Sequence, residues 1–366
     1  LVVINKRLEG ERFLRDQQAF AATLVLRRAH PEEASSCGFV FEFSDPLLVR
    51  SINFDGFEVA IARDLSAPIA YRIAKRDKNY LEGFLQPGTT DEGPGLYTVE
   101  PYQAGKIPVV FVHGLLSDPF TWSNAANEIR ARPELNSRYQ IWGFQYPTGE
   151  PFLKSAAVLR DHLNAITKKL DPHGEDPALS EIVLIGHSMG GLVAKLQVTF
   201  SGDQLWNSIS KIPLDCLVTT EETRLALRDA FYFEPVPTVS RVVFLGTPHA
   251  GSPKANRPVG RLGTKLVDEP SSMNAIRNQL LRDNPGAFTE EFERRIPTSI
   301  DLLRPESPLL QEMNCLKYSD SVRLHSIIGC GYYLVGSGDS DKVVPVTSAR
   351  ISEVESELLI ISKHTK

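Results

Sequence analysis

A serine stands in a turn bracketed by glycines at residues 186–190, which read Gly-His-Ser-Met-Gly. An apolar run at 182–185 precedes this turn, and residues 189–199 have a helical pattern. A strand-to-helix turn this sharp forces strained backbone angles at Ser188 and leaves no room for side chains at its two glycines. It presents the hydroxyl beside a helix N-terminus, whose dipole favours developing negative charge. These features predict that Ser188 is a nucleophile.

A serine nucleophile needs a base, and the base needs a carboxylate to orient it. His364 follows the last predicted strand, and Asp339 and Asp341 follow the strand predicted at 322–328. Both groups are therefore expected at the same edge of the sheet as Ser188, in the chain order serine, acid, histidine that hydrolases with this turn use. We assign His364 as the base and Asp341 as the acid, with Asp339 as the competing candidate.

A second motif, His-Gly-Leu at 113–115, follows a buried strand predicted at 107–112. Nucleophilic attack on an ester carbonyl creates an oxyanion, which two preorganised N–H donors can stabilise. A backbone loop at the end of a strand near the nucleophile is suited to that role. We expect His113 itself to be structural rather than a base.

Residues 106–366 resemble the α/β-hydrolase superfamily, and within it the bacterial lipases and carboxylesterases with HGL, GHSMGG and TPHxGS motifs. The TPHxGS-like motif lies at 247–252 and includes His249, which in that loop is usually a structural or pocket residue. The resemblance covers about two thirds of the chain and leaves residues 1–105 aside. It implies that the backbone N–H groups of Leu115 and Met189 form the oxyanion hole.

The acid has a further pattern in this family, an Asp followed by Gly, two apolar residues and Pro. Residues 341–345 read Asp-Lys-Val-Val-Pro, so Asp341 fits the register while Lys342 replaces the glycine. The register favours Asp341 over Asp339, and the lysine is a departure from the family pattern.

Strands that alternate with helices predict an α/β fold, a doubly wound, mostly parallel sheet with helices on both faces. Strands are expected at 107–112, 139–144, 181–186, 239–245, 322–328 and 358–361, and helices at 120–132, 155–170, 189–199, 221–230, 271–281 and 289–295. Helical cap insertions are expected at about 202–236 and 252–316. They interrupt a catalytic domain at 106–366.

Residues 1–105 are predicted to form a small N-terminal α+β module. Within it, residues 5–29 have the composition of a helix, and residues 38–63 alternate as strands do. A cluster of Pro and Gly at 86–95 predicts a linker or long loop before the catalytic domain.

Composition excludes several classes of function. The chain has 366 residues and a net charge of -5, with no dense basic stripe, so we expect no nucleic-acid partner. No apolar run reaches the ~18–20 residues that span a bilayer. Because the first residue is Leu1 rather than Met, a removed signal or lipid anchor is compatible with the sequence. A secreted or cell-envelope location is slightly favoured over a cytoplasmic one.

The cysteines do not indicate a metal site. There are four of them, none in a C-x-x-C pair or a Cys/His cluster. The even count permits disulfides, and buried free thiols are the favoured interpretation for Cys37, Cys216, Cys315 and Cys330. No cofactor is expected, because acyl transfer to serine needs none.

The sequence therefore predicts a serine carboxylesterase of bacterial type that acts through an acyl-enzyme on Ser188. A lipase acting on long-chain acylglycerols, an acyltransferase with the same triad and a non-catalytic binding module stay as alternatives. The substrate is expected to be a small-molecule or lipid ester. Four apolar side chains are candidates for its pocket: Leu116, Phe120, Trp122 and Tyr146.

Overall fold

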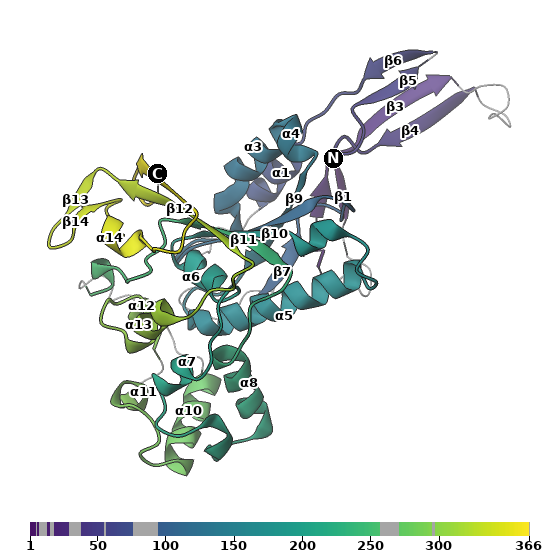
Figure 1. Ribbon diagram of the computed structural model, residues 1–366. Coiled ribbons are helices and arrows are strands. Elements are labelled where there is room, and N and C mark those ends of the chain that lie inside the picture. The colour runs from purple at the N-terminus through teal and green to yellow at the C-terminus, as the bar shows by residue number, and fades with distance from the viewer. Residues whose placement is uncertain are drawn as a thin grey trace.

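The central sheet has seven strands in the order β15-β12-β11-β10-β8-β9-β7 in this computed structural model (Figure 1). The structure describes residues 1–4, 6, 13–14, 18–28, 38–54, 56–75, 94–256, 271–294 and 297–365. Six strands run parallel, and β7 pairs antiparallel with β9 at one edge. The strands are β7 (Gly95–Thr98), β8 (Ile107–Val112), β9 (Tyr139–Gln145), β10 (Ile182–His187), β11 (Val239–Leu245), β12 (Arg323–Cys330) and β15 (Ser356–Ile361). This confirms the predicted fold class.

Helices cover both faces of this sheet because the central strands are apolar on both sides. Along β8, Val110 and Val112 pack into one buried cluster, and Val109 and Phe111 pack into another. Alternate side chains of a strand point to opposite faces, so a fully buried strand needs cover on each. One cluster includes side chains of α5 (Phe152–Leu170) and α6 (Met189–Lys195), and the other includes side chains of α1 (Ala67–Lys75) and α3 (Ser123–Ala131).

Most predicted helices form close to their expected bounds, but the helix expected at 189–199 ends at Lys195, and the chain then turns toward a β-bridge between Thr199 and Tyr318. The helix expected at 155–170 begins three residues earlier, at Phe152, with Pro151 at its N-cap, and the added residues Phe152 and Leu153 are both buried. The helix expected at 120–132 divides into a 3₁₀ turn, η1 (Pro119–Trp122), and α3. Asp118 caps that turn through its side chain. The remaining short elements here are α4 (Pro133–Asn136), η2 (Pro177–Ser180) and α14 (Val346–Ala349).

The helix predicted within residues 5–29 is wrong for the residues that the structure describes. Residues 18–20 form β2 and residues 23–28 form β3, which pairs antiparallel with β4 in register Thr23 to Ser44. The Leu- and Arg-rich composition suggested a helix, but its β-branched and apolar residues alternate and pair with the aromatic β4. The strands that precede β7 in the described residues are β1 (Val2–Ile4), β2 (Gln18–Phe20), β3 (Thr23–Arg28), β4 (Phe39–Ser44), β5 (Ser51–Phe54) and β6 (Phe57–Ala60).

Figure 1 shows the β3–β4 and β5–β6 hairpins extending away from the seven-stranded sheet. Strand β7 also precedes residue 106, yet it belongs to the main sheet. The division of the chain at residue 105 stays a prediction, and the linker predicted at 86–95 falls mainly outside the described residues.

Short helices occupy the two expected insertions. They are α7 (Gln204–Asn207), η3 (Leu214–Cys216) and α8 (Glu221–Phe231) in the first, and η4 (Pro253–Asn256), α10 (Ser271–Asp283), α11 (Glu290–Arg294), α12 (Ser299–Leu302) and α13 (Pro308–Cys315) in the second. The Asn284 side chain binds both backbone polar groups of Val218, at 2.7 and 2.9 Å. The described parts of the two insertions are therefore hydrogen-bonded to each other. Their role as a cap stays a prediction.

The structure bears on two expectations from composition, which concern membrane-spanning helices and the burial of the cysteines. Within the described part of the chain, no helix has both the length and the apolar character to cross a membrane. Cys216, Cys315 and Cys330 are free thiols, but Cys216 and Cys315 are exposed and Cys330 is only partly buried, so the expectation of burial was wrong for all three. Cys216 is the last residue of η3, and Cys315 is the last residue of α13. Cys37 lies outside the described residues.

The central position of β10 predicts a strong dependence of stability on its side chains. Leu184 is fully buried in β10, whereas Leu358 on the edge strand β15 is 56% exposed. Leu184→Ala should lower the free energy of unfolding by about 2–5 kcal/mol, since it leaves a cavity that packed neighbours fill only partly. Leu358→Ala, the matched control, should cost less than about 1 kcal/mol. Urea titration measures both, and equal losses would contradict the assigned packing.

Candidate active site

The turn after β10 is tightly packed against the end of β8. Ser188 has φ 54° and ψ -127°, a conformation that residues with a side chain rarely adopt, and only 8% of it is exposed. A Cβ atom at Gly190 would lie 2.4 Å from the carbonyl oxygens of both Val112 and His113, and one at Gly186 would lie 2.5 Å from the carbonyl oxygen of Gly190. Both positions therefore require glycine, as the sequence predicted from the turn.

Three side chains from segments far apart in the sequence form one hydrogen-bonded chain at this edge of the sheet. Nε2 of His364 lies 2.8 Å from Oγ of Ser188, and its Nδ1 lies 2.6 Å from Oδ2 of Asp341. The main-chain N–H of His364 also donates to the carbonyl oxygen of Asp341 at 2.9 Å. Because Nδ1 faces a carboxylate, it carries the ring proton, and Nε2 is free to accept from the serine hydroxyl.

Asp341 lies in a setting that favours its charged form. Its side chain is 3% exposed, and its Oδ1 accepts from the main-chain N–H groups of Val343 and Val344 at 2.9 and 2.7 Å. Burial by itself raises the pKa of Asp341, but the hydrogen bond and charge of His364 and the two N–H groups outweigh burial and leave the pKa below 3.8. The carboxylate is therefore ionised at neutral pH.

Asp339 does not contact His364 in this arrangement. It lies in the hairpin formed by β13 (Tyr332–Leu334) and β14 (Gly338–Ser340), where Oδ1 accepts from the main-chain N–H groups of Gly331 and Ser340. Asp339 therefore links the start of β13 to the end of β14, away from the hairpin turn, and Asp341 follows directly after β14.

Lys342 departs from the family pattern at a position where the backbone explains the usual glycine. Its φ is 78°, in the left-handed region that glycine adopts without strain. The lysine nitrogen lies 4.6 Å from the ring centroid of Tyr332, and its main-chain N–H donates to Oγ of Ser340 at 3.1 Å. These contacts offset part of the strain.

The His-Gly-Leu loop passes beside the nucleophile. A Cβ atom at Gly114 would lie 3.0 Å from Cβ of Ser188, so this backbone and the serine are in close approach. His113 is 1% exposed, stacks on Tyr146 with ring centroids 4.4 Å apart, and receives a 2.6 Å hydrogen bond from the tyrosine hydroxyl at its carbonyl oxygen. These contacts of Tyr146 hold the His-Gly-Leu loop in place. Met189 is the first residue of α6, directly after Ser188.

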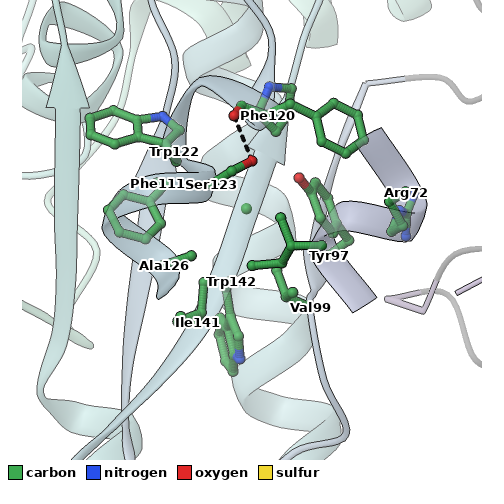
Figure 2. A pocket seen from close by; sticks show the side chains of 13 residues that line it. Arg72, Tyr97, Val99, Phe111, Phe120, Trp122, Ser123, Ala126, Ile141 and Trp142 are labelled. Carbon is green, nitrogen blue, oxygen red and sulfur yellow. Dashed lines mark hydrogen bonds between the residues drawn. The ribbon is translucent and has the colours of Figure 1, made fainter. Parts of the chain in front are cut away.

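The four candidate pocket residues lie in different places. Phe120 and Trp122 line a small apolar pocket between η1, α3 and the sheet (Figure 2). Neither Ser188 nor the His-Gly-Leu loop is among its described lining residues. Tyr146 is buried beneath His113, and Leu116 is 42% exposed next to the predicted oxyanion donor. The structure does not bring the four together around one cavity, and their role in substrate binding stays a prediction.

The loop at 247–252 joins the segment of Asp341 to the helix behind the serine. Ser252 donates through Oγ to the carbonyl oxygen of Val343 at 2.6 Å. Lys195 on α6 donates to Oδ1 of Asn314 at 3.0 Å, and Nδ2 of Asn314 donates to the carbonyl oxygen of His249 at 2.8 Å. Burial lowers the pKa of Lys195 to about 8 and that of His249 well below 6.5. His249 is thus a neutral, buried part of this loop.

His187 contacts His364, and the sequence did not predict this contact. Its Nε2 lies 3.1 Å from the carbonyl oxygen of His364, and the two rings are 4.8 Å apart. The only available signal was its position next to the nucleophile. Among the described residues, no group of three or more His, Cys, Asp and Glu side chains is arranged to hold a metal ion.

A family model described as the Alpha/beta hydrolase family matches residues 109–359, more than half of the chain. The chain belongs to the alpha/beta hydrolase family. The matched range contains Ser188 and Asp341, and this α/β-hydrolase also has the parallel sheet flanked by helices that the family name implies. A search of curated proteins finds no match to it.

Solved structures that resemble this α/β-hydrolase are distant from it. The mature lipase BlEst2 of Bacillus licheniformis is 16% identical, with 74% of this chain and 91% of that one covered and a TM-score of 0.39. EstA of Clostridium botulinum is 15% identical, with 82% and 92% covered and a TM-score of 0.41. A lipase-esterase related protein of Clostridium acetobutylicum is 16% identical, with 75% and 93% covered and a TM-score of 0.33.

The positive φ of Ser188 implies backbone strain that can be measured. Removing the Cβ atom relieves it, so Ser188→Gly should be more stable than Ser188→Ala, although glycine gains more freedom on unfolding. With strain of ~1–3 kcal/mol and a glycine cost of ~0.5–1 kcal/mol, the difference should be about 1 kcal/mol. Thermal or urea unfolding of the two variants measures it. An alanine variant equal to or more stable than the glycine one would contradict the strained φ of 54°.

The buried ring of His187 predicts a dependence of stability on pH. Burial first, and then the proximity of His364, lower its pKa from 6.5 to about 4, while Asp341 and the hydrogen bond at the carbonyl oxygen of His364 raise it. Between these values the unfolded chain binds a proton that the folded chain does not, so stability falls as pH drops from 6.5 to about 4. The loss from this one group should be on the order of 3 kcal/mol.

Urea unfolding at pH 7, 5.5 and 4 measures this loss in the wild type and in His187→Gln. The glutamine variant should show a shallower fall of stability with pH, because it lacks the titrating ring. The buried His249 contributes equally to both proteins. Identical pH profiles would contradict the neutral, buried state of His187.

Proposed function

We propose that this α/β-hydrolase is a serine carboxylic-ester hydrolase, a carboxylesterase, with Ser188 as nucleophile, His364 as base and Asp341 as orienting acid. One observation carries the proposal: the hydrogen-bonded chain from Asp341 through His364 to Oγ of Ser188, at 2.6 and 2.8 Å. Nucleophile, base and orienter within hydrogen-bond reach is the geometry that acyl transfer to serine needs.

In the proposed reaction, Oγ of Ser188 attacks the carbonyl carbon of an ester while its proton passes to Nε2 of His364. The His364 ring then gives this proton to the departing alcohol, which leaves an acyl-enzyme. Water attacks the acyl-enzyme with the same ring as base, which releases the carboxylic acid and restores Ser188. Asp341 stabilises the imidazolium form through Nδ1 and stays ionised, as its lowered pKa requires.

The oxyanion of each tetrahedral intermediate is proposed to bind the main-chain N–H groups of Leu115 and Met189. Two features support this assignment: Met189 begins α6 directly after the nucleophile, and the backbone of the His-Gly-Leu loop approaches Cβ of Ser188 closely. The dipole of α6 adds partial positive charge where the oxyanion forms. Donors of this kind contribute ~100- to 1000-fold each to turnover.

The proposal predicts a ranking of three variants in p-nitrophenyl ester hydrolysis. Ser188→Ala should lower turnover by at least ~10³-fold, and Asp341→Asn by roughly 10³- to 10⁴-fold, because an amide no longer fixes the proton on Nδ1. Asp339→Asn is the matched control and should change turnover by less than about threefold, since its Oδ1 can still accept from the hairpin N–H groups.

Circular dichroism confirms that each variant is folded, and a fluorophosphonate probe reports the reactivity of the serine. Loss of turnover in Asp339→Asn with retention in Asp341→Asn would reverse the assignment of the acid. Unchanged turnover in Ser188→Ala would overturn the proposed function.

A further inference from the structure

Four rings lie in a row from Phe111 on β8 to His364, the proposed base. Phe111 stacks on Trp122 with centroids 4.7 Å apart, and Trp122 meets the ring of His187 edge-on at 6.4 Å. The ring of His187 in turn lies 4.8 Å from that of His364, with the planes tilted by 38°. His187 is therefore held on one side by apolar rings and touches His364 on the other. The mechanism proposed above uses only the last ring of this row.

His187 also makes a directed contact with the main chain of His364. Its Nε2 lies 3.1 Å from the carbonyl oxygen of His364, and a carbonyl oxygen only accepts, so Nε2 carries the proton and donates. The ring is neutral at neutral pH, since burial lowers its pKa to about 4. The carbonyl oxygen of His364 therefore fixes the tautomer of His187.

The segment that carries His364 needs such an anchor. It follows β15, an edge strand whose six residues are all exposed. Among the described residues, the main chain of His364 is bonded at its N–H by Asp341 and at its carbonyl by His187. The first bond joins the base to the acid, and the second joins it to the last residue of β10, directly before the nucleophile. The two bonds together fix the ring between its two partners.

We propose that His187 is a positioning residue for this hydrolase: it fixes the main chain of His364 so that Nε2 of the base stays within hydrogen-bond distance of Oγ of Ser188. The inference rests on the proposed function. His187 touches neither substrate nor the reacting atoms in this role. It acts on catalysis only through the position of His364, and displacing a catalytic group by about 1 Å can cost on the order of 100-fold in rate.

Two substitutions separate the donor from the ring. His187→Gln keeps an N–H donor at a reach similar to Nε2, and His187→Phe keeps a planar ring and loses the donor. We expect His187→Phe to lower kcat by roughly 10- to 100-fold with little change in KM, because only the geometry of proton transfer is disturbed. His187→Gln should restore kcat to within about fivefold of the wild type. If the phenylalanine variant does not fold, His187→Asn, whose amide is too short to reach the carbonyl, replaces it.

The matched control is His173→Phe, the same exchange at an exposed histidine in the turn after α5, before the start of β10 rather than at its carboxyl end, and it should leave kcat unchanged. Equal kcat in the wild type and in His187→Phe would overturn the proposal. So would equal losses in the phenylalanine and glutamine variants, since both would then reflect a general disturbance of packing. Thermal unfolding of each variant accompanies the kinetics.

A crystal structure of each variant provides a readout that does not depend on ester turnover. The distance from Nε2 of His364 to Oγ of Ser188 should stay near 2.8 Å in His187→Gln and exceed hydrogen-bond range in the variant without the donor. A retained hydrogen bond in that variant overturns the inference. If the wild type hydrolyses no ester, the proposed function fails, and this distance still decides whether His187 positions His364.

Discussion

The site depends on how closely the backbone after β10 approaches the end of β8. No side chain fits between the turn of Ser188 and the carbonyl oxygens of Val112 and His113, and the serine itself adopts a φ of 54°. Such strain persists only where the surroundings determine the conformation fully. Here the surroundings are a buried parallel sheet with helices on both faces, so the rigidity of the core is what holds the serine hydroxyl at the surface of the turn.

The parallel direction of the strands explains why residues far apart in the chain meet. The turn of Ser188, the His-Gly-Leu loop, the loop at 247–252 and His364 each follow a parallel strand whose carboxyl end lies at the same edge, and Asp341 comes after the β13–β14 hairpin that follows β12. These segments then bind one another: Ser252 holds the segment of Asp341, Asp341 holds His364, and His187 holds the main chain of His364. These hydrogen bonds, together with the sheet, hold the hydroxyl of Ser188 and the imidazole of His364 in place.

The charge states of the residues at this edge of the sheet depend on the balance between burial and hydrogen bonding. Asp341 is kept ionised by hydrogen bonds that outweigh its burial, whereas His187 and His249 are kept neutral because burial disfavours their charged forms. The negative charge of Asp341 lies against Nδ1 of His364, which favours one tautomer and leaves Nε2 facing the serine. Neutral histidines around it avoid a competing positive charge.

Local periodicity and sterics in the sequence predict the order of the parallel strands from residue 107 onward and of most helices that cover them, the need for glycine on both sides of Ser188, and the grouping of the motifs at one sheet edge. Tertiary structure settles which carboxylate lies against His364, since Asp339 and Asp341 are two residues apart and bond to different partners. It likewise decided that residues 23–28 form a strand, that Tyr146 supports His113, and that His187 reaches His364. Each of these depends on a contact with a distant segment, about which local sequence carries no information.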